Sequence, residues 1–445
     1  MNPVFAKYCL FLPVVALRNE HVFRELSSLM QSQWHSEEEL KKKQARKLRH
    51  LLAYAKSNVP YYSGIFKNAD IDKSLSSYYD VPMLTKEIIR EKRRMLHSNN
   101  NYLLKTGKTT GGSTGEPITI LKTSSSMAKE RAALWRGYSW AGIHIGDRQA
   151  RFWGVPFKQK DKLIAGVVDF VNNRKRISAF NFDEKRLQQY YDILNRFKPK
   201  YFYGYVSAIR EFTEYCWAKK LQLKFDLKTI ITTAEELTND DKMLLQNVNK
   251  CRVYNEYGSG EVGTIAHECE KGKLHINSEN VLVEIVSEDG SRCSNGEIGQ
   301  IVITELNNTF FPLIRYKIGD MGKLSEEKCL CGRGLPVLEG VYGRAYDVIK
   351  TPYGKKYHPS FFNYIFKEID KYNFGIKQFQ VIQQEKSKLL VNIVTSKPTT
   401  EKLVYQIKRM INDNIQYNFI IDIENVKAIQ REKSGKIRVV KGLSN

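Results

Sequence analysis

Short apolar runs alternate with helical stretches through the middle of this chain, and no other feature restricts the possible folds as strongly. The strand candidates are Ile118–Leu121, Ala150–Trp153, Tyr201–Tyr205, Thr229–Thr233 and Arg252–Tyr254. Strands that alternate with helices form a sheet with helices packed on its faces. We therefore expect an α/β domain over residues 101–260.

The flanking regions differ from this middle part. Residues 1–100 are predicted to be helical: Ser36 and Glu39 match a capping box before a long amphipathic helix that Pro60 ends, and Thr85 is a cap for a helix over Lys86–Met95. Residues 261–343 are β-rich and predict a second layer or a barrel-like subdomain. We expect residues 1–343 to form one large domain and residues 344–445 a small α+β domain that ends in a hairpin-like segment.

The formal charge of +23 restricts the partners less than its size suggests. Such a charge suits nucleic acid, an anionic membrane or a polyanionic substrate. The basic residues are dispersed and no nucleic-acid module accompanies them, so we expect a solvated surface and no nucleic-acid partner. The apolar run Tyr8–Leu17 is too short to span a bilayer. We expect it to pack against the body, with peripheral contact to an anionic membrane as the alternative.

Seven cysteines, an odd number, occur in a long chain with no secretory signature, which favours a reducing cytoplasm over a disulfide scaffold.

The stretch Thr109–Pro117 reads Thr-Thr-Gly-Gly-Ser-Thr-Gly-Glu-Pro. Its glycines allow close approach of the backbone, and Ser113, Thr114 and successive N–H groups can form an anion-binding concavity. It lacks the Lys-Ser/Thr pair of the usual P-loop. We interpret it as a loop for the phosphates of ATP.

Further motifs follow this loop in a definite order: Thr232–Glu236, Asn255–Glu261, Phe311–Asp320, Gly343–Ile349 and Ser434–Arg438. Together they resemble the motifs of the adenylate-forming (ANL) superfamily. The nearest resemblance is to the branch of phenylacetate–CoA ligases, CapK-like proteins and coenzyme F390 synthetase-like proteins, whose members begin with a similar basic helix ending in Asn-Val-Pro-Tyr-Tyr, here Asn58–Tyr62.

The resemblance implies a ligase that forms AMP. Such an enzyme uses ATP and Mg²⁺ to convert a carboxylic acid to an acyl-adenylate with release of pyrophosphate, and then transfers the acyl group to an acceptor, by default the thiol of coenzyme A. Transfer to an amine of a sugar or carrier in surface-polysaccharide biosynthesis is an alternative. A second alternative is an inactive relative that binds a membrane or glycan through its positive charge.

The resemblance also implies roles for individual residues. Lys436 and Glu261 are the catalytic candidates, with Glu261 as a magnesium ligand and Lys436 bridging the α-phosphate and the carboxylate. The ATP-binding candidates are Ser113, Thr114, Gly115, Ala234, Glu235, Tyr257, Gly258, Asp320 and Arg344. Rotation of the last domain is expected about Tyr346 and Asp347, where many family members carry Asp or Lys at the position of Tyr346.

Two further sequence patterns bear on ligand binding. Gly258–Gly263 formally matches the dinucleotide-binding Gly-x-Gly-x-x-Gly pattern, but an extended segment follows it where that pattern needs a helix. The acyl pocket is expected around aromatic residues and a glycine, namely Trp153, Tyr203, Gly204 and Tyr205. Aromatic walls suit a flat or apolar acid, but they leave aryl, fatty and amino acids open.

A zinc site is predicted from two turns. Cys269 and His275 flank one turn, and Cys329 and Cys331 lie in another. Residues that flank a hairpin turn approach each other, so three thiolates and one imidazole can complete a closed tetrahedral structural zinc site. His267, two residues before Cys269, is a rival ligand.

Overall fold

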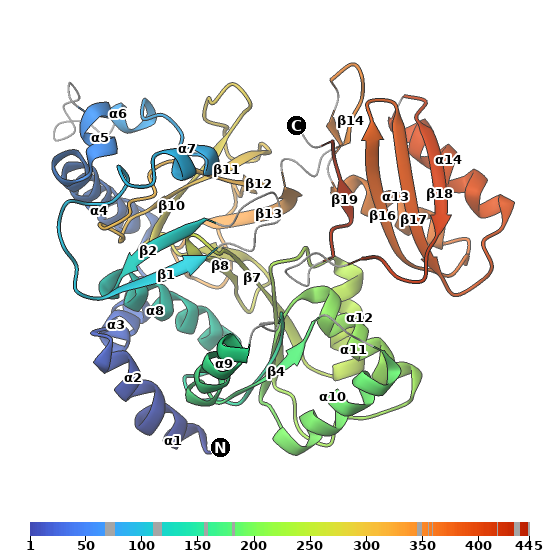
Figure 1. Cartoon of the computed structure of the whole chain (residues 1–445), viewed down its shortest axis with the longest axis horizontal. Coiled ribbons are helices and arrows are strands. Elements are labelled where there is room, and N and C mark those ends of the chain that lie inside the picture. The colour runs from blue at the N-terminus through green and yellow to red at the C-terminus, as the bar shows by residue number, and fades with distance from the viewer. Residues whose placement is uncertain are drawn as a thin grey trace.

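The computed structural model describes residues 1–66, 76–109, 118–154, 159–179, 183–344, 349–354, 356–357, 359–415, 417–430 and 437–443. A large part built on a mixed sheet is followed by a small part built on a second sheet, which lies on the right in Figure 1. This is the expected α/β architecture with a separate α+β segment at the end of the chain. None of the helices in these ranges has the length and hydrophobicity needed to cross a membrane.

Helices dominate the first hundred residues, as predicted. They are α1 (Pro3–Phe5), the π-helix η1 (Ala6–Phe11), α2 (Leu12–Leu17), α3 (Val22–Ser32), α4 (Glu37–Asn58), α5 (Pro60–Ile65), α6 (Ser76–Tyr79) and α7 (Lys86–Glu91). The capping box of α4 is present, since the Ser36 hydroxyl accepts the Glu39 N–H and the Glu39 carboxylate accepts the Ser36 N–H. Thr85 caps α7, but that helix ends at Glu91, four residues before the predicted Met95.

Eleven strands form the large sheet, in the order β10-β11-β12-β13-β9-β8-β7-β6-β5-β3-β4. The parallel half holds β3 (Gln149–Trp153), β4 (Arg174–Ser178), β5 (Tyr201–Gly204), β6 (Thr229–Thr233) and β7 (Arg252–Ser259). The helices of this half are α8 (Ser124–Trp140), α9 (Gln159–Val171), α10 (Glu184–Phe197), α11 (Val206–Ala218) and α12 (Asn239–Asn249). The helix between each pair of parallel strands is the connection that parallel pairing requires.

The antiparallel half holds β8 (Gly263–Glu268), β9 (Leu274–Ile276), β10 (Val281–Val286), β11 (Gly299–Glu305), β12 (Tyr316–Leu324) and β13 (Val337–Arg344). These strands extend the same sheet, and the expectation of a separate layer or barrel for 261–343 is wrong in that respect. A second difference concerns β2 (Thr119–Thr123), which pairs with β1 (Lys105–Thr109) in a ribbon outside the large sheet. Sequence pattern predicts strands, but pairing depends on distant partners.

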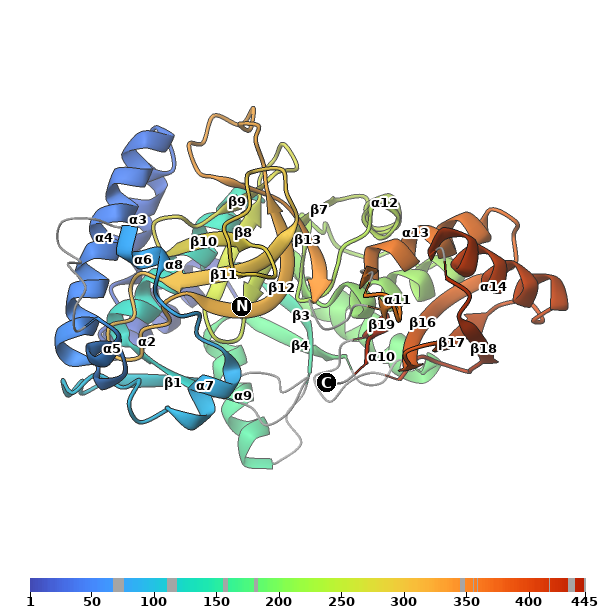
Figure 2. The ribbon, with the colours of Figure 1, turned by 90° about the horizontal axis from the view of Figure 1, so that it is seen from above.

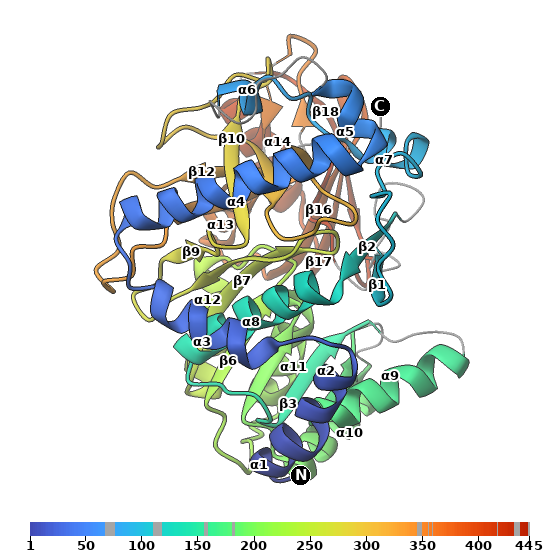
Figure 3. The ribbon, with the colours of Figure 1, turned by 90° about the vertical axis from the view of Figure 1, so that its left-hand side faces the viewer.

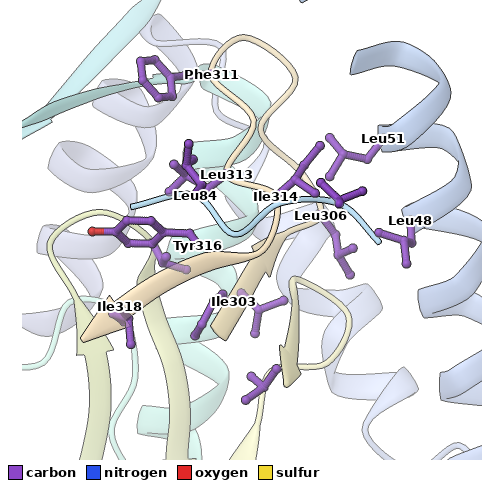
Figure 4. Packing of buried hydrophobic residues seen from close by; sticks show 14 of the residues in the cluster. Leu48, Leu51, Leu84, Ile303, Leu306, Phe311, Leu313, Ile314, Tyr316 and Ile318 are labelled. Atoms are coloured by element: carbon purple, nitrogen blue, oxygen red, sulfur yellow. The ribbon is translucent and has the colours of Figure 1, made fainter. Parts of the chain in front are cut away.

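The main core joins the N-terminal helices to the antiparallel half of the sheet (Figure 4). Leu48 and Leu51 of α4 belong to the same buried cluster as Leu313 and Ile314 near the start of β12. Burial of each such side chain contributes about 1.5 to 3 kcal/mol. Packing across this core therefore fixes α4 and α7 against the strands that carry the candidate site.

The end of the chain forms a small α+β unit with a core of its own. Its elements are β14 (Ile349–Lys350), β15 (Lys356–Tyr357), α13 (Pro359–Asp370), β16 (Ile376–Glu385), β17 (Lys388–Thr395), α14 (Glu401–Ile415), β18 (Ile420–Asn425) and β19 (Val440–Lys441). The sheet order is β18-β17-β16-β19, so the predicted terminal hairpin is wrong: β18 and β19 lie on opposite edges, each parallel to its neighbour. Figure 2 shows β19 on the edge that faces the large part.

Candidate active site and metal-binding cluster

Segments with predicted ATP-site and acyl-pocket residues lie at the carboxyl ends of parallel strands β5, β6 and β7. Tyr205 follows β5, Ala234 follows β6, and Tyr257 and Gly258 lie near the end of β7. Carboxyl ends of parallel strands share one edge of a sheet, which is where ligands bind in open α/β sheets. Ala234 has a φ of 68°, a left-handed conformation that turns the chain sharply after β6. The fold therefore gathers these segments at a chemically plausible edge.

Asp320 approaches this edge from β12. The Tyr257 hydroxyl donates a hydrogen bond to Asp320 Oδ2 at 2.8 Å, which links the two predicted nucleotide contacts directly. Arg344, at the end of β13, is the backbone partner of Asp320 in the antiparallel ladder. A carboxylate held in this way can accept hydrogen bonds from a sugar hydroxyl.

Glu261 lies in the turn between β7 and β8 and is only 4% exposed. Its Oε1 accepts a hydrogen bond from the Tyr316 hydroxyl at 2.8 Å and lies 3.4 Å from Lys86 Nζ. Lys86 and Tyr316 were not among the predicted site residues. Tyr316 falls within the Phe311–Asp320 motif, but no local pattern connects Lys86 to a carboxylate 175 positions later. A buried carboxylate with a cationic partner provides the oxygen chemistry that a divalent cation prefers.

Glu235 connects the large part to the tail of the chain. Its Oε2 accepts the Ser207 N–H at 2.7 Å, and its Oε1 accepts the Ser207 hydroxyl and the Ile437 N–H, both at 3.0 Å. Ser207 lies in the first turn of α11, where the helix dipole favours a negative charge. Glu235 thus positions the tail, a role that the sequence did not indicate.

Several predicted residues fall outside the described ranges. These are Ser113, Thr114 and Gly115 of the glycine-rich loop, Tyr346 and Asp347 of the hinge, and Lys436. The loop joins β1 to β2, and Lys436 is bonded directly to Ile437. Ile437, the described neighbour of Lys436 in the chain, therefore reaches the edge that carries Glu235.

The predicted acyl wall is an aromatic cluster with a cation in it. The ring centroid of Trp153 lies 4.3 Å from that of Tyr205 and 5.9 Å from that of Tyr203. The Arg151 guanidinium carbon lies 4.6 Å from the Trp153 centroid, a cation–π contact that the sequence reading missed. Packing explains why residue 204 is a glycine, because a Cβ there would lie 2.0 Å from the Phe152 carbonyl oxygen of β3.

Glu256 is buried behind this wall. Burial raises the pKa of its carboxyl group to about 7, although hydrogen bonds from Tyr138 and Tyr203 and the charge of Arg151 oppose the shift. The Tyr138 hydroxyl donates to Glu256 Oε2 at 3.3 Å. The folded protein therefore holds a proton on Glu256 that the unfolded chain releases at lower pH.

This difference predicts a pH-dependent stability. The ordinary carboxyl pKa is 4.5, so ionisation of Glu256 destabilises the folded state progressively as pH rises from about 4.5 through about 7. We expect Glu256→Gln to stabilise the protein by about 2 kcal/mol more at pH 8 than at pH 5, measured by denaturant unfolding. Glu385→Gln, at an exposed position, serves as the control. The same wild-type-to-variant difference at both pH values would contradict the assignment.

The four predicted metal ligands come together. Cys269, His275, Cys329 and Cys331 present ligand atoms that all lie within 4.8 Å of one another. Cys269 Sγ lies 3.6 Å from Cys329 Sγ, and Cys331 Sγ lies 3.2 Å from His275 Nε2. Cys269 and His275 flank the β8–β9 hairpin turn as expected, since Glu268 pairs with Leu274.

The histidine is oriented as a ligand. His275 Nδ1 lies 3.0 Å from the Leu335 carbonyl oxygen, which can only accept, so Nδ1 carries the proton and Nε2 is left to bind a metal. Burial lowers the His275 pKa to about 4, which keeps the ring neutral. His267, the rival, is absent from the group of ligand atoms found among the described residues; its Nε2 lies 2.7 Å from Thr264 Oγ1.

The chain is similar to known proteins along most of its length. The family described as the CapK C-terminal domain matches residues 349–442. Protein CapK of Staphylococcus aureus is 26% identical over 441 residues, covering 94% of this chain and 92% of that protein. This chain is therefore similar to CapK over nearly its whole length. The CapK-like chain is also 22% identical over 336 residues to a phenylacetate–coenzyme A ligase of Thermus thermophilus, covering 70% of this chain and 72% of that one.

A solved structure shares this fold over most of the chain. The 2-hydroxyisobutyryl-CoA ligase in its postadenylation state matches the CapK-like chain with a TM-score of 0.69 at 18% identity, covering 90% of this chain and 89% of that one. The same ligase in its thioesterification state gives 0.58 at 19% identity over the same share of this chain. The two parts of the CapK-like chain are therefore arranged more nearly as in the first of these states.

Proposed function

We propose that this chain is an ATP-dependent ligase that forms AMP: it activates a carboxylic acid as an acyl-adenylate and passes the acyl group to an acceptor. One contact carries the proposal. The Ile437 N–H bonds to Glu235 beside the strand edge that holds Ala234 and Tyr257, so the residue bonded to Lys436 is anchored at the predicted nucleotide site. The arrangement of the two parts, nearer to a postadenylation ligase, supports the same conclusion.

The nucleotide would lie along this edge. The Tyr257 ring would pack against the base, with Ala234 and Gly258 beside it, and Asp320 would accept hydrogen bonds from the ribose with Arg344 nearby. Glu235 is engaged by Ser207 and Ile437, so its role would be to hold the tail rather than to read the base. Such fixed hydrogen bonds favour reaction by positioning.

The magnesium ion and the charged groups that act on the phosphates would lie around Glu261. Its buried carboxylate would be a ligand of the magnesium ion that accompanies ATP, and Ser113, Thr114 and Gly115 would hold the phosphates. Lys86, 3.4 Å from Glu261, adds a cation on the same side. Lys436 would offset the negative charge that develops as the carboxylate attacks the α-phosphate. The protein thus supplies donors, a cation and a metal ligand, which is what this transfer needs.

The Cys269, His275, Cys329 and Cys331 cluster would hold zinc as a structural ion. Three sulfur atoms and one nitrogen leave no open position for substrate in a tetrahedral site. The Leu335 carbonyl that orients His275 is the kind of outer partner that bound histidines use. Zinc would tie the β8–β9 hairpin to the turn before β13.

Coenzyme A is the acceptor we propose by default, because the phenylacetate–coenzyme A ligase relative matches 70% of this chain. An amine acceptor is the alternative outcome of the acceptor test. Purified protein would first be charged with its acid and ATP, and then offered either coenzyme A or an amino sugar. If the acyl-adenylate is consumed with only one of these two compounds, that compound identifies the acceptor class.

The reaction itself is tested by isotope exchange. We expect labelled pyrophosphate to enter ATP only when a suitable acid is present, in a screen of aryl, fatty, hydroxy and amino acids. Exchange above the acid-free background by about tenfold or more would support the proposal. An absence of exchange with every acid, from folded protein saturated with ATP and magnesium, would favour the inactive binding protein.

A further inference from the structure

Helix α9 turns an apolar face toward solvent. The positions involved recur with helical spacing and share one side of the helix. This apolar face of α9 consists of Leu163, Ile164, Val167, Val168 and Phe170, whose exposed fractions are 74%, 53%, 58%, 43% and 61%. Contiguous exposed apolar surface of this kind marks a site that another surface covers.

Asp169, near the end of the helix, points the other way. Asp169 forms ion pairs with Arg174 and Arg176 of β4, and its Oδ2 lies 3.0 Å from Arg176 Nε. Helices on the surface of soluble domains normally bury the apolar side and expose the charged side. α9 is therefore reversed: a charged side chain faces the body and the aliphatic ones face outward.

The first helices lie next to α9 and expose apolar side chains as well. Figure 3 places α1 and α2 beside α9, and η1 contacts α9. The Asn173 side chain, just after α9, donates to the Met1 carbonyl at 3.3 Å. This N-terminal segment exposes Val4, Phe5, Tyr8 and Leu12 at 64%, 50%, 52% and 37%. Two neighbouring segments thus each expose apolar residues to solvent.

Basic groups lie on the same elements and on the neighbouring strand β4. Lys160 and Lys162 at the start of α9 and Lys175 of β4 are exposed, and Lys7 Nζ lies 4.8 Å from the Tyr8 ring. In the sequence, the acidic residue Asp161 stands between these two α9 lysines. A second copy placed on this surface would bring these cations together and be repelled, whereas an anionic lipid surface would attract them.

We propose that the apolar face of α9, with the neighbouring N-terminal helices, docks on the surface of an anionic lipid bilayer. α9 has 13 residues, about 20 Å of helix, which is short of the roughly 30 Å hydrocarbon core. It would lie in the interface, with its aliphatic side chains below the headgroups and the lysines beside the lipid phosphates. This docking does not depend on the ligase activity proposed above.

Vesicle co-sedimentation of the full chain tests the proposal. We expect binding to vesicles of equal parts phosphatidylglycerol and phosphatidylcholine, weak binding to pure phosphatidylcholine, and loss of binding as salt rises. Leu163→Glu/Val167→Glu should lower partitioning by about tenfold or more. Lys160→Glu/Lys162→Glu, which changes only exposed charges, should lower it by a similar factor on anionic vesicles.

Met243→Glu is the matched control, because Met243 is 53% exposed on α12, away from this surface. It should bind as the wild type does, and thermal melting checks that every variant is folded. Absence of wild-type binding to anionic vesicles would overturn the proposal, as would binding that neither double variant weakens. A dimer in solution that Leu163→Glu/Val167→Glu converts to monomer would assign the face to a second copy instead.

Discussion

Lys436→Ala should reduce acid-dependent exchange of pyrophosphate into ATP by about a hundredfold or more. Ile437, bonded to Lys436, is held by Glu235 at the strand edge that carries the predicted nucleotide contacts. A cation placed there offsets charge that forms only as the carboxylate attacks the α-phosphate, so its loss should lower the rate more than it weakens ATP binding. Exchange rates over a range of ATP concentrations separate these two effects.

Two controls make this result specific. Lys427→Ala removes an exposed lysine of the same tail and should leave exchange within about twofold of wild type. Acyl transfer from synthetic acyl-adenylate should survive in Lys436→Ala, since that step no longer involves the α-phosphate attack. Full exchange activity in Lys436→Ala, with the acid that supports the wild type, would remove Lys436 from the adenylation step.

Cys329→Ser should remove one equivalent of bound zinc and lower the unfolding temperature by roughly 5 °C. The cluster joins Cys269 to a residue 60 positions later, and closing a loop of that length stabilises the folded state by about 4 kcal/mol in the chain-entropy picture. Elemental analysis of protein prepared without chelator measures the metal. Differential scanning calorimetry measures the shift, and a chelator should reproduce it in the wild type.

Cys9→Ser is the matched control, because Cys9 is exposed and outside the cluster. Its zinc content and melting temperature should equal those of the wild type. Wild-type protein with no zinc, or a Cys329→Ser variant that keeps its full equivalent, would refute the structural zinc site.

Much of the local structure follows from neighbouring residues. The Ser36–Glu39 capping box, the strand over Thr229–Thr233 and the hairpin that brings Cys269 to His275 are all present as predicted. The segment after the Gly258–Gly263 pattern is a strand, not the helix that dinucleotide binding needs. Each of these features is set by hydrogen bonds and turns within a few residues, which is why sequence pattern predicts them.

Long-range pairing was harder to predict. Apolar alternation marked residues 118–121 and 261–343 as β structure, but it could not say that β2 leaves the large sheet or that β8 to β13 join it. The contacts of Glu261 with Lys86 and of Glu235 with Ile437 bring together positions that are far apart in the chain. The residue type at each position is visible in the sequence, but its partner depends on how distant elements pack.

The amino-acid order by itself determined the local elements, the order of the nucleotide-site motifs and the set of possible zinc ligands, because these depend on short stretches of chain. Tertiary structure decided which strands share a sheet, which carboxylates meet cations and which side of α9 faces solvent. The sequence pattern of the apolar stripe on α9 is the same whether the stripe is buried or exposed. The packing of α9 on β4, which includes the ion pairs of Asp169, leaves the stripe exposed. Burial depends on how the whole chain packs, so a short stretch of sequence alone does not determine it.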